Sequence, residues 1–147
     1  MPANDLHHLA IKTEDVDATV DFWNGVIGSH SVDRPDFNFP GAWLQFGETM
    51  IHLYGGDAAK NKAGRHDRGS AAIDHVALSA SGFDEMRDLF GEKNLDWRQM
   101  DIPSFHLWQL FVHDPNGVLV ELNFDARQEP PGSAGPDDRK VYDPGSF

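Results

Sequence analysis

Eight histidines in a chain without cysteine are the feature of this sequence best suited to chemistry. Without a thiolate, a transition-metal site must use imidazole nitrogen and carboxylate oxygen as ligands. Four candidate ligands stand at comparable places in the two halves of the chain: His8 and His52, then His75 and Glu121. Their offsets are nearly equal, with 67 residues between His8 and His75 and 69 between His52 and Glu121. Such matched offsets indicate an internal repeat.

The segments that contain these four residues alternate as strands with one buried face do. Around His8, the aliphatic side chains of Leu9 and Ile11 point to one face and the histidine points to the other. The segments around the other three candidates repeat this pattern. If each aliphatic face packs on a helix, the opposite faces carry three imidazoles and one carboxylate toward a concavity. That set suits a divalent Zn, Ni, Co, Fe or Mn ion.

The elements that position these strands occur twice in the order βαβββ. Helices are predicted at about residues 16–26 and 83–93, with Thr13 or Asp15 and then Ser81 as candidate caps. Each helix leads into a strand and a hairpin, and the second hairpin reverses at an Asp-Pro-Asn-Gly turn. We therefore expect an α+β fold in which two tandem βαβββ modules form a concave, partly closed mixed sheet around a metal site.

The length of 147 residues is that of one domain. We expect this domain to cover residues 1–125, with module one at about 5–56, a basic linker at about 57–70 and module two at about 71–125. The remaining residues, 126–147, are rich in Pro, Gly and Asp and lack the side chains to build a core. They are predicted to form an extended or loosely attached C-terminal extension.

The charge balance narrows the partners of the protein. Twelve Lys and Arg against 24 Asp and Glu give a formal net charge of −12, which repels phosphate backbones and anionic lipids. No apolar stretch approaches the roughly 20 residues of a membrane span, and the first five residues do not resemble a signal peptide. We expect a cytoplasmic protein that binds a small-molecule substrate and neither nucleic acid nor membrane.

At these positions the sequence resembles the vicinal oxygen chelate superfamily, which contains glyoxalases, bleomycin resistance proteins and extradiol dioxygenases. The resemblance covers about residues 5–125. It rests on the segments 8–11, 22–28, 41–53 and 73–77 and, most specifically, on 109–122. Members share the paired βαβββ fold and bind a divalent metal through the first and last strands of each module. The resemblance therefore implies His8, His52, His75 and Glu121 as ligands, and a homodimer as the functional form.

The resemblance leaves three functions open. A glyoxalase-like lyase or isomerase, working through an enolate-type intermediate, would use Glu121 as ligand and base, and His52 as a fourth ligand favours this class. An extradiol-type ring-cleaving dioxygenase would use Fe(II) or Mn(II) held by two histidines and one carboxylate, with His106 as acid–base. A non-catalytic resistance protein would only bind a small-molecule drug, but such members usually lack the metal ligands that are present here.

Overall fold

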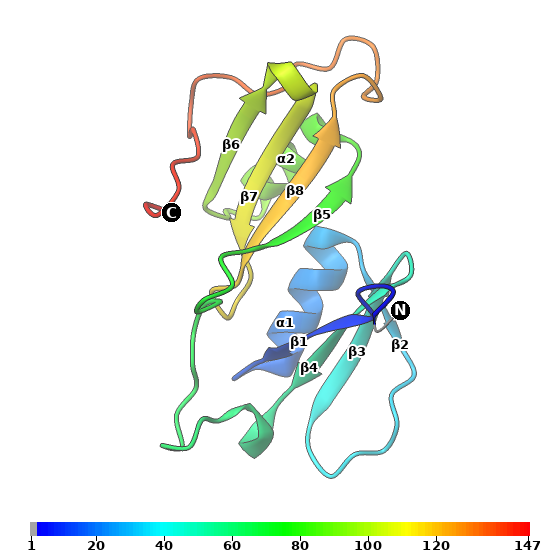
Figure 1. The fold of residues 1–147 in the computed structure, drawn as a ribbon, viewed down its shortest axis with the longest axis vertical. Coiled ribbons are helices and arrows are strands. Elements are labelled where there is room, and N and C mark those ends of the chain that lie inside the picture. The colour runs from blue at the N-terminus through cyan, green and yellow to red at the C-terminus, as the bar shows by residue number, and fades with distance from the viewer. Residues whose placement is uncertain (1–2) are drawn as a thin grey trace. The chain divides into compact units, whose positions relative to one another are not determined.

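Two four-stranded sheets form the framework of residues 3–147, which are the residues described by the computed structural model. The chain divides into two units, the first with residues up to 69 plus 114–116 and the second with 70–113 plus 117–147. Each unit holds one sheet, with strand orders β1-β4-β3-β2 and β5-β8-β7-β6 (Figure 1). In each sheet the first strand pairs in parallel with the last, and the other pairs are antiparallel. The predicted α+β class and the repeated βαβββ order are confirmed, but neither sheet is closed.

The first unit builds its core between its sheet and α1. Its elements are β1 (His8–Lys12), α1 (Val16–Phe22), a π-helical turn (Trp23–Ile27), β2 (His30–Val32), β3 (Gly41–Phe46), β4 (Thr49–Tyr54) and a short 3-10 turn (Gly56–Ala59). Asp15, one of the two predicted candidate caps, caps α1 by accepting a hydrogen bond from the backbone amide of Ala18 at 2.9 Å. The predicted helix to residue 26 is α-helical only as far as Phe22. The π-helical turn that continues it buries Trp23 completely.

The hairpin turn at residues 114–116 belongs to the first unit because its polar side chains reach α1 and the π-helical turn. Asp114 accepts a hydrogen bond from the Trp23 indole nitrogen at 3.3 Å. The side-chain amide of Asn116 donates to the hydroxyl of Thr19 at 3.0 Å, and the backbone amide of Asn116 donates to the Asp114 carboxylate at 2.8 Å. The predicted turn residues therefore do more than reverse the chain, because their buried hydrogen bonds also satisfy polar atoms beneath α1.

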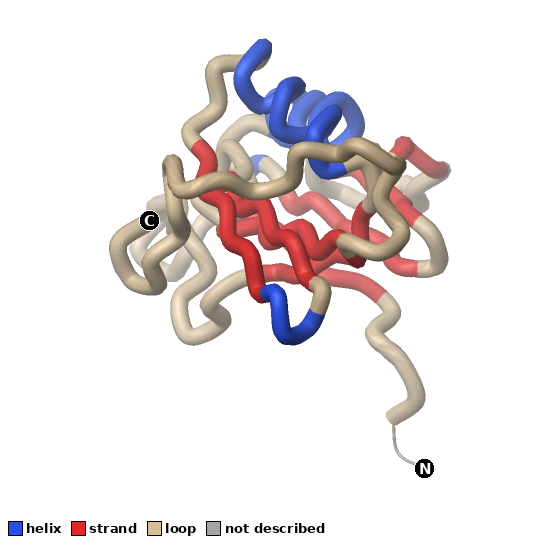
Figure 2. The backbone as a smooth tube through the Cα atoms, turned by 90° about the horizontal axis from the view of Figure 1, so that it is seen from above, coloured by secondary structure: helices blue, strands red, loops and turns tan. Residues whose placement is uncertain are grey.

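The second unit packs α2 on one face of its sheet (Figures 1 and 2). Its elements are β5 (Val76–Ala80), α2 (Phe83–Glu92), β6 (Trp97–Ile102), a 3-10 turn (Pro103–Phe105), β7 (Leu107–His113) and β8 (Leu119–Asp125). Phe83 and Phe90 of α2 are fully buried together with Leu110, Leu122 and Phe124 of the sheet. The residues that alternate with these, among them Gln109, Phe111 and Glu121, lie on the opposite face of the sheet.

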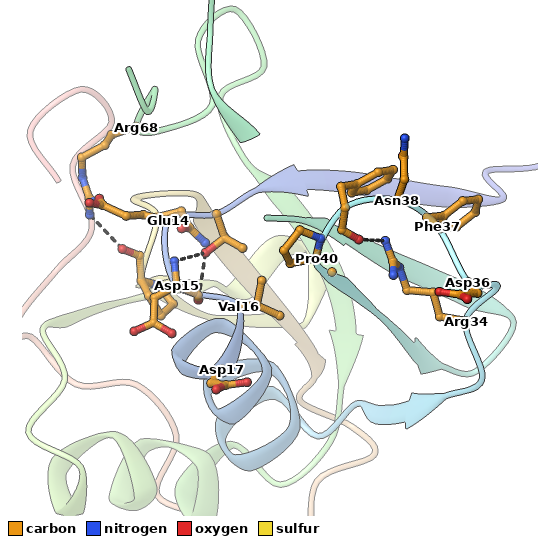
Figure 3. A pocket seen from close by; sticks show the side chains of 15 residues that line it. Glu14, Asp15, Val16, Asp17, Arg34, Asp36, Phe37, Asn38, Pro40 and Arg68 are labelled. Carbon is orange, nitrogen blue, oxygen red and sulfur yellow. Dashed lines mark hydrogen bonds between the residues drawn. The ribbon is translucent and has the colours of Figure 1, made fainter. Parts of the chain in front are cut away.

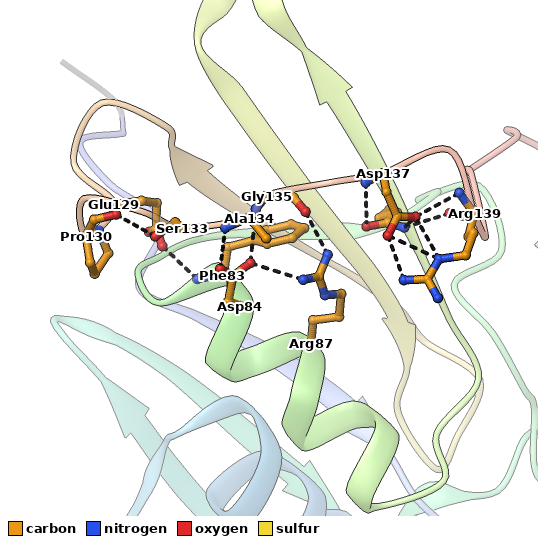
Figure 4. Close-up of polar contacts among 11 residues, drawn as sticks. Phe83, Asp84, Arg87, Glu129, Pro130, Ser133, Ala134, Gly135, Asp137 and Arg139 are labelled. Carbon is orange, nitrogen blue, oxygen red and sulfur yellow. Dashed lines mark hydrogen bonds and ion pairs between the residues drawn. The ribbon is translucent and has the colours of Figure 1, made fainter.

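The C-terminal extension is not loosely attached, so that prediction is wrong. Its Glu129 carboxylate accepts hydrogen bonds from the amides of Gly82 and Phe83, at 3.0 and 2.8 Å, at the start of α2 (Figure 4). This remote side chain caps the helix in place of the predicted Ser81, because the N-cap residue is Gly82 and has no side chain of its own. Further along, the amides of Ala134 and Gly135 bond to Asp84.

We expect Glu129→Ala to lower the free energy of unfolding by about 1 kcal/mol, because two amides at the N-terminus of α2 lose their acceptor. Urea unfolding followed by circular dichroism measures this change. Glu92→Ala is the matched control, since Glu92 is exposed in the last turn of the same helix and should cost little or nothing. Equal stability of the Glu129 variant and the wild type would show that the cap is unimportant.

Candidate functional site

The first pair of candidate ligands lies on the sheet face that points away from α1. In the register of the first sheet, Leu9 lies opposite Ile51 and both point toward the core, so His8 and His52 point to the other face. Their imidazole rings stack with centroids 3.9 Å apart. The other side of the His52 ring stacks on Trp43 at 4.1 Å, with the planes nearly parallel. Packing therefore fixes the orientation of the His52 ring.

Burial favours the neutral form of His52. It lowers the pKa of His52 below the usual histidine value, and the nearby imidazoles of His8 and His7 lower it further, because like charges would repel. His52 is therefore a neutral imidazole at pH 7, which is the form that binds metals. Its Nε2 atom is buried and has no hydrogen-bond partner among residues 3–147. Such an atom has a lone pair or a proton available for a ligand.

The second pair makes a direct contact within the second unit. His75 Nε2 lies 2.9 Å from Glu121 Oε2. The other carboxylate oxygen, Oε1, accepts a hydrogen bond of 2.7 Å from the Gln109 amide, which also donates to Asn123 at 2.9 Å. Because Gln109 and Glu121 are both buried, these bonds stabilise a carboxylate that would be costly to bury alone.

His75 lies between two carboxylates. Its Nδ1 atom is 2.7 Å from Asp74, opposite the contact with Glu121. A ring that donates to both must carry two protons. A ring that binds a metal through Nε2 needs only the Nδ1 proton, and a carboxylate that accepts this proton is the usual partner of a metal-binding histidine.

The two pairs occupy equivalent positions in their sheets. In β3 and β4, Trp43 lies opposite His52, and in β7 and β8, Phe111 lies opposite Glu121. Each candidate ligand on a last strand is thus next to an aromatic residue on the same face. This register match is independent of the offsets in the sequence and supports the repeat that they indicated.

His106 lies away from both pairs of candidate metal ligands. It follows the short 3-10 turn in a left-handed conformation, immediately before β7. Leu107 at the start of β7 lies opposite Asp125, whereas Glu121 lies opposite Phe111, so four strand positions, about 13 Å, separate Leu107 from the level of Glu121, and His106 lies one residue further away. His106 lines a small pocket with Asn123 and Arg127.

A large open pocket in the first unit lies away from these histidines. It has a volume of about 1090 Å³ and is lined by residues from the start of α1, the loop before β3 and the segment around Arg68. Figure 3 shows Glu14 and Arg68 on one side and Arg34 with Phe37 on the other. None of the four candidate ligands lines it.

Two further features of residues 3–147 concern metal ions and membranes. No cluster of three or more metal-binding side chains occurs within residues 3–147, where the candidates form two pairs, one in each unit. Over the same residues, neither helix has the length and apolar composition to cross a bilayer.

Comparison with known proteins places the chain in a family. The Glyoxalase/Bleomycin resistance protein/Dioxygenase superfamily matches residues 5–122. The protein Glyoxylase I 4 of Arabidopsis thaliana is 26% identical over 121 residues, which are 80% of this chain and 68% of that protein.

Solved structures share the fold at low sequence identity. A lactoylglutathione lyase from Agrobacterium tumefaciens is 19% identical, with a TM-score of 0.64 over 87% of this chain and 98% of that chain. A genomically encoded fosfomycin resistance protein from Listeria monocytogenes is 14% identical, with a TM-score of 0.65 over 83% of this chain and 93% of that chain. Since the family match spans most of the chain and the predicted repeat is present, the chain belongs to the Glyoxalase/Bleomycin resistance protein/Dioxygenase superfamily, as the resemblance predicted.

Proposed function

We propose that this chain is a metal-dependent lyase or isomerase of the glyoxalase type, acting on a small substrate that presents two neighbouring oxygens. The observation that carries the proposal is the pair of matched half-sets, His8 with His52 and His75 with Glu121, at equivalent positions of two sheets. The names of the Arabidopsis and Agrobacterium relatives point in the same direction.

The side chains fit a divalent metal ion. His52 is neutral and has a buried Nε2 without a partner, and His75 has Asp74 to hold its Nδ1 proton. Three imidazoles and one carboxylate suit Zn, Ni, Co, Fe or Mn. When bound, such an ion supplies Lewis-acid stabilisation of negative charge that develops on the substrate oxygens. Each unit contributes two of the four candidate ligands, and we propose a homodimer as the functional form.

Glu121 is the group that moves the proton. Gln109 holds its Oε1 atom and fixes the direction of the carboxylate, and Oε2, which lies 2.9 Å from His75 Nε2, is the oxygen that accepts a proton. The base removes the proton from the carbon next to the substrate carbonyl and returns it to the neighbouring carbon, so no net proton is consumed. Burial of the carboxylate keeps bulk water from exchanging that proton.

The dioxygenase alternative is less well supported. It needs His106 as an acid–base next to the carboxylate ligand, but His106 lies more than about 13 Å along the strands from the level of Glu121. A fourth ligand at His52 would also occupy a metal position that a catechol and O₂ require. Both points favour the lyase or isomerase.

We expect the purified, untagged protein to contain about one Zn, Ni or Co ion per chain, and His52→Ala to lower metal affinity at least tenfold, roughly the loss seen when metal sites are altered. Elemental analysis and competition with a chelator measure both quantities. His30→Ala, which changes an exposed histidine of β2, is the control and should retain its metal. An unchanged affinity in the His52 variant would exclude this residue as a ligand.

We expect Glu121→Gln to lower kcat by roughly 10²–10⁴-fold, because the amide cannot accept a proton. The variant should remain folded, since the new side chain has the same size. Turnover of the hemithioacetal of methylglyoxal and glutathione, followed by absorbance, tests this, with far-ultraviolet circular dichroism as a check of the fold. Glu48→Gln in the turn between β3 and β4 is the matched control. Normal turnover by the Glu121 variant would remove this residue from the mechanism.

A further inference from the structure

We propose that the C-terminal segment of residues 137–147, called here the C-terminal strap, is part of the substrate-binding surface beside Glu121. Within it, Tyr142 contacts the substrate and selects for a flat group beside the two substrate oxygens. This inference deepens the proposed function, since it takes Glu121 as the proton-transfer group. It assigns a role to a part of the chain that lies beyond the family match, which ends at residue 122.

The strap is held at the edge of the second sheet by Gln99 of β6. The Gln99 backbone amide donates to the carbonyl of Lys140, and its carbonyl accepts from the amide of Tyr142, both at 2.9 Å. The fully buried side chain of Gln99 donates to the Asp137 carboxylate at 2.8 Å and to the Arg139 carbonyl at 2.7 Å. Figure 1 shows the strap, coloured red, running beside β6. It thus extends the sheet beyond its edge strand.

Beyond this edge, the strap turns onto the sheet face that carries Glu121. The ring of Tyr142 stacks on Phe111 with centroids 3.7 Å apart and planes 8° from parallel, and Tyr142 is only 9% exposed. Met100, Leu119 and Phe147 complete this cluster. Because Gln109 and Phe111 alternate with the residues that face α2, the cluster lies on the face away from the helix.

Tyr142 therefore lies beside the second pair of candidate ligands. Its stacking partner Phe111 is the residue directly opposite Glu121 in the register of β7 and β8. Burial raises the pKa of Tyr142, and the negative charges of Asp74 and Glu121 raise it further, which agrees with this position. The phenol is thus protonated at pH 7. No hydrogen bond from its hydroxyl is found among residues 3–147, so this proton is free to be donated to a substrate oxygen.

The chemistry of this surface favours a flat group on the ligand. Phe147 extends the aromatic surface to His113, at a centroid distance of 4.5 Å. Arg98 covers Phe147, but its charge is matched by Asp96 at 2.6 Å. A flat group would stack on this surface, and a substrate oxygen would accept the tyrosine proton.

Titration with catechol tests the proposal, because catechol is neutral, flat and has two adjacent oxygens. Wild type, Tyr142→Ala, Tyr142→Phe and Val141→Ala are compared by isothermal titration and amide chemical shifts, each without metal and with added Zn²⁺. Val141→Ala is the control because Val141 is an exposed neighbour on the same strap. We expect Tyr142→Ala to bind catechol roughly tenfold more weakly, Tyr142→Phe about threefold more weakly and Val141→Ala normally. Shifts in the wild type should centre on Phe111, Glu121 and Tyr142.

The possible outcomes separate this inference from the proposed function. Equal catechol affinity in wild type, Tyr142→Ala and Tyr142→Phe would overturn the role of Tyr142. An absence of binding by the wild type, both with and without Zn²⁺, would overturn it too. If Tyr142→Ala does not fold, Tyr142→Phe alone decides, since it keeps the stacked ring. Normal turnover by Glu121→Gln, together with weaker catechol binding by the Tyr142 variants, would refute the proposed function and leave the binding surface in place.

Discussion

Side-chain alternation along strands that pack on a helix is the constraint on which the candidate site depends. In the first sheet, Leu9 and Ile51 are register partners turned toward the core, and this leaves only the opposite face for His8 and His52. A slip of one residue would exchange the two faces, bury the histidines against α1 and expose the aliphatic side chains. The free energy that holds the register comes from the core, so the histidines need no interaction of their own to be positioned.

The two candidate pairs use this position in different ways. Glu121 is a buried carboxylate, which is tolerated because Gln109 and His75 surround both of its oxygens with polar groups. His52 is held by stacking on Trp43, and its Nε2 atom has no partner. An unsatisfied buried nitrogen costs about 1–3 kcal/mol, and a structure that keeps one gains from it only when something binds there. The first pair is thus the one that keeps a buried polar atom unsatisfied.

The sequence predicts those parts of the fold that depend on neighbouring residues. Alternation around His8 and Glu121 predicts strands, and Thr13 or Asp15 is predicted to cap the first helix. The strands are found in the structure, and Asp15 is the cap. The candidate ligands could be chosen in the same way, because the repeat makes positions in the two halves comparable. The pairing of His75 with Glu121 is a further step, since it requires knowing that β5 lies next to β8.

The parts that could not be predicted depend on residues distant in the sequence. Composition alone suggests that residues 126–147 lack a core, but Glu129 caps a helix that begins 47 residues earlier at Gly82. Similarly, a turn pattern does not reveal that Asn116 bonds to Thr19, 97 residues away. No local pattern encodes such contacts, because a carboxylate or an amide looks the same whether it faces solvent or a distant helix.

Ordering the strap costs conformational entropy, and its exposed ion pairs do not offset this cost. Fixing each residue costs roughly 1–2 kcal/mol, more for glycine, and exposed ion pairs such as Arg139 with Asp137 return little. The largest favourable terms are therefore the burial of Tyr142 on Phe111 and the backbone bonds to Gln99. Since Phe111 lies directly opposite Glu121, the interactions that keep the strap in place lie next to the proposed base. A ligand that packs against Tyr142 adds to the same interactions, so binding at this surface and the order of the strap stabilise one another.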